Sequence, residues 1–369
     1  MDFVSVIFFA WVILFIGMVW IVPYKYTEYI LAASGISFII IVAPIGGIIL
    51  LTESLICYYI VKQQQKPQWI NTLITISLVF LAFLICKYFA LKGSFVLPLG
   101  ISYFTFRLIH YVQEGFKNRL REHNFPEFLA YITFFPTYLI GPINLFPEFI
   151  QNLRRRNWNT NMFTYGIERM IYGYAQLVII GNFIVNFLLQ NWISANVVST
   201  STFINLCIQS IQIWLDLYIR FSAYTSIVIG ISAMAGFIVP ENFFYPFLAG
   251  NIREFWQRWH MSLTNWCREY IYIPVAAITR KPVLAIGATM ITIGIWHELS
   301  FRYILWGLYH SLGIIIFEKF SSVKTGKPAH NKIYMTISKI AGVIITLIFV
   351  ILSFPVSTMI NNLIMNLIK

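Results

Sequence analysis

The side chains best suited to chemistry lie between residues 251 and 310, which hold three of the six histidines, His260, His297 and His310. A neutral imidazole has a pKa near neutrality, so it can accept the proton of a hydroxyl group that acts as a nucleophile. His297 is the best candidate for this general base because it lies inside an apolar segment, where a polar group is expensive and therefore indicates a function. The alternative, a histidine that only hydrogen-bonds between helices, stays open on these residues alone.

His260 lies in a segment, residues 253–272, in which aromatic and charged residues alternate. This pattern is typical of a helix that lies at the membrane interface or lines a water-filled funnel. His260 is therefore a candidate second catalytic group or a residue that shapes the acceptor site. Arg253, Arg258 and Arg268 are suited to guide a substrate that carries phosphate, and anchoring at the membrane interface is the equal alternative.

The other histidines give a weaker signal. His310 lies thirteen residues after His297. This is more than three turns of one straight helix, so we interpret His310 as a packing residue. His110, His123 and His330 lie at the ends of apolar segments or in loops, and we expect them to be solvated. Metal binding by His260 and His297 is an alternative, but the ligand spacing of known zinc sites and a carboxylate partner are missing, so no metal site is predicted.

The composition predicts a membrane protein. Of the 369 residues, 59% are hydrophobic and 11% are charged, and the mean hydropathy is +0.73. A soluble domain carries about 25% charged residues. Several apolar runs approach the roughly 20 residues that a membrane-spanning helix needs. We therefore expect an all-α, polytopic membrane protein with a single membrane domain over residues 1–369.

The net charge of +12 does not indicate nucleic acid as a partner. The basic residues fall in short clusters between apolar runs, as the positive-inside rule predicts for cytoplasmic loops, and Arg154 to Arg156 are one such cluster. No basic face is expected outside the membrane rim. The four cysteines are scattered in apolar segments without a CxxC pair, which is typical of packing residues.

The apolar runs predict roughly ten membrane spans, counted with the hydropathy rule. The first run, residues 3–22, lacks a basic leader and a cleavage site, so we expect a retained span. Residues 29–61 are too long for one span and contain Pro44 in the middle, which predicts a helical hairpin. The other expected spans lie at about residues 70–89, from 97 to the basic segment 117–123, and at 163–189, 202–238, 283–296, 301–317 and 339–364.

Two of these regions are expected to be irregular. Residues 134–142 contain two prolines and a glycine, which predicts a broken or re-entrant helix surrounded by protein or water. Residues 202–238 are expected to break near Asp216 and Arg220. These two side chains stand one helical turn apart and can pair, either as part of a site or only to hold helices together.

Several enzyme classes leave signatures that this sequence lacks. It has no HExxH zinc motif, no GxSxG nucleophile elbow, no P-loop and no dinucleotide fingerprint. The residues alone therefore describe a multi-span protein with a polar, histidine-bearing pocket. They leave an enzyme and a transporter as open alternatives.

A resemblance separates these alternatives. The chain resembles the membrane-bound O-acyltransferase family, and within it the bacterial branch of alginate O-acetyltransferases and teichoic-acid D-alanyl transferases. The matching segments occur in the family's order, with a core at about residues 90–315. They are residues 99–107 (LGISYFTFR), 135–143 (FPTYLIGPI), 240–243 (PENF), 255–263 (FWQRWHMSL), 295–297 (IWH) and 305–310 (LWGLYH).

The resemblance implies a fold and a site. The fold would be a ring of tilted transmembrane helices with re-entrant segments around a central catalytic tunnel, where funnels from both faces meet near a histidine. His297 would be the essential catalytic histidine, and His260 a second histidine shared by the bacterial branch. The expected substrate-binding residues are Arg253, Trp256, Arg258, Trp259, Ser262, Arg268, Trp296 and Glu298.

The resemblance also implies a reaction. An acyl group, acetyl or D-alanyl-like, would move from a cytoplasmic thioester, an acyl-CoA or the phosphopantetheine of an acyl carrier protein, to a hydroxyl of an extracytoplasmic envelope glycan or polymer. No bound cofactor is expected. The acceptor is the polymer or a periplasmic or extracellular acyl-relay protein, and the location is the bacterial cell membrane. A transporter or flippase, or a non-catalytic assembly subunit for an envelope polymer, is the alternative.

The chain differs from the family pattern at positions close to the expected site. Glu298 follows His297 where relatives usually have glycine, and Arg220 stands where many relatives have aspartate. Ser226 stands where alginate-type relatives often have a second aspartate. These differences concern the acyl donor, the acceptor and the partner proteins more than the reaction class.

Overall fold

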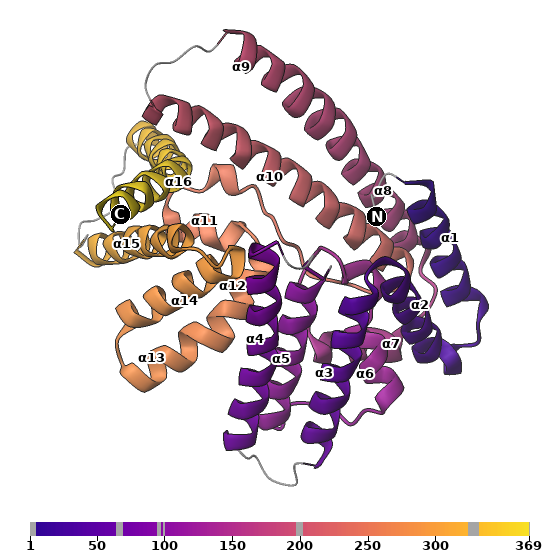
Figure 1. Ribbon diagram of the computed structural model, residues 1–369. Coiled ribbons are helices and arrows are strands. Elements are labelled where there is room, and N and C mark those ends of the chain that lie inside the picture. Colours follow the sequence, from indigo (N-terminus) through magenta and orange to yellow (C-terminus); the bar gives the residue numbers. More distant parts are fainter. Residues whose placement is uncertain are drawn as a thin grey trace. The chain divides into compact units, whose positions relative to one another are not determined.

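The computed structural model describes residues 5–63, 69–93, 97–98, 100–196, 202–323 and 332–368. Figure 1 shows that the regular elements in this part of the chain are helices, which confirms the predicted all-α class. Leu99 in the first family-like segment, and His330, lie outside the described residues.

The chain divides into two compact units. The first unit comprises residues 1–175 and 223–240, and the second comprises residues 176–222 and 241–369. Helix α10, Thr202–Met234, contributes its residues up to Ser222 to the second unit and the rest to the first. All of the predicted site residues belong to the second unit.

The first unit contains the N-terminal helices. Their bounds are α1 Val6–Ile21, η1 Tyr24–Tyr26, α2 Thr27–Val42, α3 Pro44–Gln63, α4 Trp69–Leu91, α5 Ile101–Phe116, α6 Phe125–Ile132, η2 Phe135–Thr137, α7 Phe146–Arg155 and α8 Thr160–Ala175. Helix α5 packs against α3 and α4, and α6 packs against α2.

The second unit contains the remaining helices. Besides its part of α10, these are the π-helix η3 Gln176–Leu189, α9 Gln190–Asn196, η4 Pro246–Leu248, α11 Ile252–Arg258, α12 Met261–Cys267, the π-helix η5 Arg268–Tyr272, α13 Ile273–Thr279, α14 Pro282–His297, α15 Phe301–Val323 and α16 Lys332–Ile368. Figure 1 shows α14 and α15 side by side, and α16 packs against α15.

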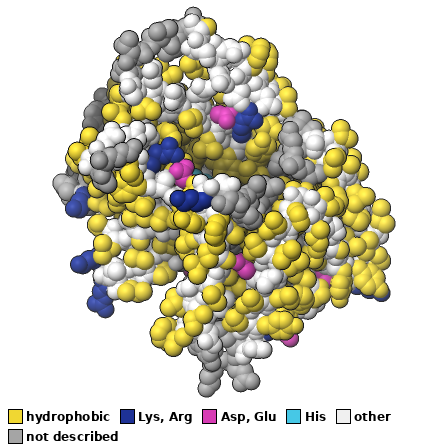
Figure 2. Space-filling view, viewed as in Figure 1, with side chains coloured by type: hydrophobic (Ala, Val, Ile, Leu, Met, Phe, Trp, Pro, Cys, Tyr) yellow, Lys and Arg dark blue, Asp and Glu magenta, His cyan; other side chains and the backbone are white. Residues whose placement is uncertain are grey.

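Six helical segments among the described residues are long and apolar enough to cross a membrane, and the chain is a multi-pass membrane protein. They are Tyr24–Val42, Pro44–Gln63, Trp69–Leu91, Thr160–Ala195, Thr202–Met234 and Met335–Leu367. In the segment Trp69–Leu91, only 22% of the most apolar stretch is buried inside the protein. Figure 2 shows hydrophobic side chains over most of the visible face. So much exposed apolar surface needs lipid around it.

The helix boundaries test the predicted spans. The predicted hairpin is confirmed, because α2 ends at Val42 and α3 begins at Pro44, whose ring is tolerated in a first helical turn. Six helical segments among the described residues are long and apolar enough to cross a membrane, which is fewer than the roughly ten spans predicted. Helix α14, for example, has 16 residues and is shorter than the other candidates.

The predicted break in residues 202–238 is wrong. Helix α10 runs from Thr202 to Met234 without interruption. Arg220 Nε donates to Asp216 Oδ1 at 2.6 Å, so the two charges neutralise each other on one helix face. An i, i+4 pair of this kind supports a helix, and no proline or glycine stands between Asp216 and Arg220 to end it.

The predicted irregularity at residues 134–142 is confirmed, since only the short turn η2 is regular there. Arg107, which is 0% exposed, stabilises it from α5. Its guanidinium donates to the carbonyls of Tyr131 at 3.4 Å, Ile132 at 3.3 Å and Thr137 at 2.6 Å. One buried cation thus satisfies carbonyl groups that a continuing helix would have bonded.

The prediction that His110 and His123 are solvated is wrong. His110 is 2% exposed, and the Phe146 backbone N–H donates to its Nε2 at 3.0 Å. His123 is 7% exposed, and its Nε2 lies 2.8 Å from the Tyr111 hydroxyl. A place at the end of an apolar segment or in a loop did not reveal the burial of these rings, because neighbouring helices cover both.

Candidate functional site

His297 is the last residue of α14, where the helix ends as Glu298 turns to extended backbone. Its side chain is exposed, whereas His260 and His310 are 2% and 1% exposed. The carbonyl end of a helix carries partial negative charge. His297 is therefore accessible and lies beside the carbonyl end of α14.

After α14 the chain turns back, so that α15 packs along α14 and lies against His297. Glycines make this close packing feasible, since a Cβ on Gly307 would lie 2.6 Å from the Met290 carbonyl oxygen. The Tyr303 ring stacks 5.7 Å from the His297 ring, and the Trp306 ring lies 5.3 Å from it, edge to face. His297 thus stands in an aromatic surrounding.

One cavity, which we call the histidine cavity, contains His297. Its volume is about 130 Å³. It is lined by Ser210, Ile213, Trp214, Leu217, Phe255, Trp256, Trp259, His297, Tyr303, Trp306, His310, Val350, Ser353 and Phe354. None of these side chains is an Asp, Glu, Lys or Arg, so His297 and His310 are the only basic side chains among the described residues that line the cavity.

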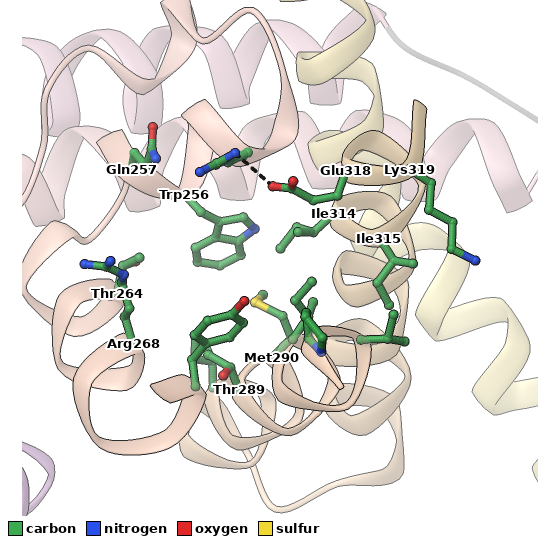
Figure 3. Close-up of a pocket in the computed structure, with 16 residues that line it drawn as sticks. Trp256, Gln257, Thr264, Arg268, Thr289, Met290, Ile314, Ile315, Glu318 and Lys319 are labelled. Atoms are coloured by element: carbon green, nitrogen blue, oxygen red, sulfur yellow. Dashed lines mark ion pairs between the residues drawn. The ribbon is translucent and has the colours of Figure 1, made fainter. Parts of the chain in front are cut away.

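A second, larger cavity of about 440 Å³ lies against α11, η5, α14 and α15, and we call it the basic cavity (Figure 3). Arg253, Arg268 and Lys319 are among its lining residues, and Arg253 Nη1 pairs with Glu318 Oε1 at 3.1 Å. Its walls otherwise include apolar side chains such as Met290. This combination suits a ligand with an anionic part and an apolar part.

Trp256 lines both cavities. It comes from α11, whose first turn is capped because Asn251 Oδ1 accepts from the Glu254 N–H at 2.8 Å. The Trp256 ring lies 5.3 Å from the His310 ring and 5.9 Å from the Trp306 ring. The side chain therefore stands in the wall between the two spaces.

His260 is held by the loop that begins at Pro240. Asn242 Oδ1 accepts from the Ser262 hydroxyl at 2.6 Å and from the Ser262 N–H at 3.3 Å. The Met261 N–H donates to the Asn242 carbonyl at 2.9 Å. His260 itself has φ +43°, a left-handed conformation that costs energy for a residue with a side chain. The loop thus fixes a strained residue before α12.

The His260 ring is sandwiched between aromatic rings. Phe221 lies 4.8 Å and Trp296 lies 5.7 Å from it, and Trp296 lies 4.6 Å from His297. Burial, reinforced by nearby His297, lowers the pKa of His260 to about 3. His260 is therefore a neutral imidazole whose link to His297 runs through Trp296.

The remaining predicted residues take several places. Trp259 lines the histidine cavity and stacks on Trp214 at 6.0 Å. Arg258 lines neither of these cavities and pairs with Glu254 at 2.6 Å. Glu298 pairs with Arg302 at 3.1 Å. The geometry thus brings some predicted binding residues to a cavity and leaves Arg258 and Ser262 as supports of the backbone.

Sequence reasoning missed His310 as a cavity residue. Its interpretation as a packing residue assumed one straight helix with His297, but the two lie on α15 and α14. Because α15 runs back along α14, His310 reaches the same cavity. The LWGLYH segment of the resemblance was the available signal. Among the described residues, no cluster of three or more His, Cys, Asp or Glu side chains is placed to hold a metal ion.

Comparison with known proteins identifies the chain's relatives. The family model of membrane-bound O-acyltransferases matches residues 39–360. The chain belongs to this family. The resemblance inferred from the six sequence segments is thereby confirmed.

Relatives in the membrane-bound O-acyltransferase family come from several bacteria. The chain is 30% identical over 225 residues to a probable alginate O-acetylase of Pseudomonas aeruginosa, covering 60% of this chain and 42% of that protein. It is 30% identical over 274 residues to a teichoic acid D-alanyltransferase of Bacillus subtilis, covering 69% and 67%. It is 28% identical over 291 residues to a peptidoglycan O-acetyltransferase of Helicobacter pylori, covering 69% and 53%. The chain thus matches less than half the length of the alginate O-acetylase.

Proposed function

We propose that this chain is an O-acyltransferase of the bacterial cell membrane that acylates a hydroxyl of an extracytoplasmic envelope glycan or polymer. The observation that carries the proposal is the exposed His297 ring in an aromatic cavity, one tryptophan away from a basic cavity of about 440 Å³. Family membership supports the reaction class. The relatives that act on alginate, teichoic acid and peptidoglycan support an envelope polymer as acceptor.

His297 acts as the general base. Its ring nitrogen takes the proton of the acceptor hydroxyl while the hydroxyl oxygen bonds to the carbonyl carbon of the acyl thioester. The resulting imidazolium is stabilised by the carbonyl end of α14. When the carbon–sulfur bond breaks, the leaving thiolate takes this proton and becomes a thiol. The products are an ester and a free thiol.

The two cavities receive the two substrates. The basic cavity suits the donor, because Arg253 and Arg268 can bind phosphate groups of CoA or of a carrier protein's phosphopantetheine. Trp256, Trp259 and Trp296 form aromatic walls beside the reacting groups. A direct transfer needs both substrates held in line, which adjoining cavities provide. No bound cofactor takes part.

Other residues support the site indirectly, through the residues that they contact. His260, which is neutral and lies against Trp296, orients the wall next to His297. Ser262 holds the loop before α12 in place. Arg258 and Glu298 form ion pairs with Glu254 and Arg302 respectively.

The proposed architecture is the one that the resemblance implies. It is a ring of about ten tilted membrane-spanning helices, with re-entrant segments, around a central tunnel. Residues 1–369 form one membrane domain in this proposal. The donor enters from the cytoplasmic face, and the acceptor, or an acyl-relay protein outside the membrane, approaches from the other.

The experiment that tests this function is mass spectrometry of base-labile esters on envelope polymers. Cells that carry the wild-type chain are compared with cells that carry His297→Ala at equal membrane levels. We expect an ester that disappears in the variant, and its mass names the acyl group. An unchanged ester profile, in cells that need the gene for an envelope polymer, would exclude catalysis and favour transport or assembly.

A further inference from the structure

The Trp256 side chain carries an unused hydrogen-bond donor at the junction of the two cavities. It is 6% exposed, and its indole nitrogen is buried without a hydrogen-bond acceptor. An indole N–H can only donate, and buried donors in folded proteins are nearly always paired. An orphaned donor in a cavity wall therefore indicates a ligand that accepts from it.

The Trp256 N–H lies on a side chain that borders both cavities and is linked to His297 through Trp306. Trp256 lines both the basic cavity and the histidine cavity. The Trp306 ring contacts the Trp256 ring at 5.9 Å and the His297 ring at 5.3 Å. The Trp306 indole therefore links the Trp256 ring to the general base His297. Figure 3 shows the Trp256 indole at the cavity, with its nitrogen on the ring edge that faces Ile314.

Acyl transfer needs such a donor. As the hydroxyl adds to a thioester, the carbonyl π electrons move onto oxygen, and catalysts stabilise that oxyanion with fixed N–H groups. We propose that the Trp256 indole N–H donates to the carbonyl oxygen of the acyl thioester and to the oxyanion formed from it. This inference rests on the proposed acyltransferase function and adds a catalytic residue to it.

The complete step balances with this residue included. The acceptor oxygen bonds to the carbonyl carbon, its proton moves to His297, and the negative charge on the carbonyl oxygen is held by the Trp256 N–H. The oxyanion then re-forms the carbonyl and expels the thiolate, which takes the proton from His297. Trp256 neither gains nor loses a proton.

The indole is fixed before substrate arrives. Phe255 lies 5.7 Å from the Trp256 ring at an interplanar angle of 84°, and His310 contacts it at 82°. The Asn251 cap fixes the first turn of the short helix α11 that carries it. A donor fixed in this way stabilises charge without reorganising during the reaction.

The test removes the N–H and keeps the ring. Trp256→Phe, and replacement of Trp256 by 3-benzothienylalanine, which has sulfur in place of the N–H, are assayed in membranes containing equal amounts of full-length chain. The donor probes are S-acetyl- and S-D-alanyl-pantetheine, which share the arm of CoA and carrier proteins. We expect kcat to fall by about 10²–10³ in both variants, as for loss of one oxyanion donor, with little change in KM.

Two controls separate this role from packing. S-Ethyl-pantetheine lacks the carbonyl, so its inhibition constant is expected to stay unchanged in both Trp256 variants. Trp11→Phe is the matched control, because the Trp11 indole nitrogen is also buried without an acceptor, in α1 of the other unit. It is expected to keep the wild-type kcat.

The outcomes distinguish this inference from the proposed function. If the benzothienylalanine variant keeps kcat within about threefold of wild type, far from the loss expected for an oxyanion donor, Trp256 is not that donor, although His297 catalysis stands. If inhibition by S-ethyl-pantetheine weakens as much as kcat falls, the residue shapes the cavity and the inference is overturned. If the wild-type chain transfers neither acyl group, both proposals fail.

Discussion

His297 and His260 are chemically identical side chains in opposite surroundings. His297 is exposed at the end of α14, whereas His260 is buried and its pKa is lowered to about 3 by burial and by His297. A group that stays neutral at all ordinary pH values is poorly suited to accept the proton of the reaction. This difference supports our proposal that His297 transfers the proton and that His260 positions the site.

Replacing His260 by asparagine tests the positioning role. Asparagine adopts the left-handed conformation more readily than most residues, so the backbone at φ +43° is retained. We expect a melting temperature close to wild type and a fall in ester formation of about tenfold or more, below the full effect of losing a general base. Ester mass spectrometry and thermal unfolding in detergent are the measurements. Wild-type ester formation would show that the His260 imidazole has no part in transfer.

Asn242 is the residue expected to hold His260 in place. It is 0% exposed, and Asn242→Ala leaves the Ser262 N–H and hydroxyl without their acceptor. We expect a loss of about 1–3 kcal/mol of stability, the usual cost of unpaired buried groups. Ser262→Ala removes only the hydroxyl and serves as the milder comparison. Equal melting temperatures for all three proteins would contradict this role of the loop.

At the scale of elements, the contact between α14 and α15 places Trp306 and His310 beside His297. Most of the elements themselves could be predicted from sequence. Apolar runs predicted the helices, Pro44 predicted the hairpin, and the prolines of residues 134–142 predicted a break. The pairing of α14 with α15 could not be predicted, because hydrophobicity shows that a helix is buried but not which helix covers it.

The glycines of these two helices provide a matched pair of tests. A Cβ on Gly307 would lie 2.6 Å from the Met290 carbonyl oxygen, whereas a Cβ on Gly287 would meet nothing within 4 Å. Gly307→Ala is expected to separate α15 from α14, lowering both melting temperature and ester formation. Gly287→Ala is expected to stabilise the protein by roughly 0.5–1 kcal/mol, because alanine favours helix. The reverse order of melting temperatures would argue against the observed packing.

The same limit explains the errors made for three histidines. His110 and His123 were predicted to be solvated because they lie at span ends or in loops, and His310 was interpreted as a packing residue outside the site. In each case a neighbouring element decides the surroundings of the ring. The sequence segments of the resemblance did locate His297, His260 and most of the aromatic wall, because short motifs carry the local pattern of a site.

For the molecule as a whole, burial of His123 in the first unit makes stability depend on pH. Burial lowers the pKa of His123 below the value of about 6.5 in an unfolded chain, although its contact with the Arg121 carbonyl opposes this. Lys62 donates to the His123 carbonyl at 2.6 Å, and Glu127 and Arg154 are the other charged groups nearby.

The sign of the effect follows from proton binding. Below about pH 6.5 the unfolded chain takes up a proton at His123 that the folded chain does not, so stability falls as the pH falls. His123→Gln is expected to flatten the decrease in melting temperature between about pH 6.5 and pH 5. Parallel curves for the variant and the wild type would show that His123 does not contribute to acid sensitivity.

The central claim concerns the whole molecule, which is expected to move an acyl group across the membrane through His297. The most direct test uses sealed inside-out vesicles from cells that make the native envelope polymer, supplied with labelled S-acetyl- or S-D-alanyl-pantetheine on the cytoplasmic face. We predict that the wild-type chain places label in base-labile esters of the enclosed polymer. His297→Gln at equal abundance is predicted to reduce this label by at least about 10², the usual contribution of a general base. Equal labelling by the two proteins would contradict the account.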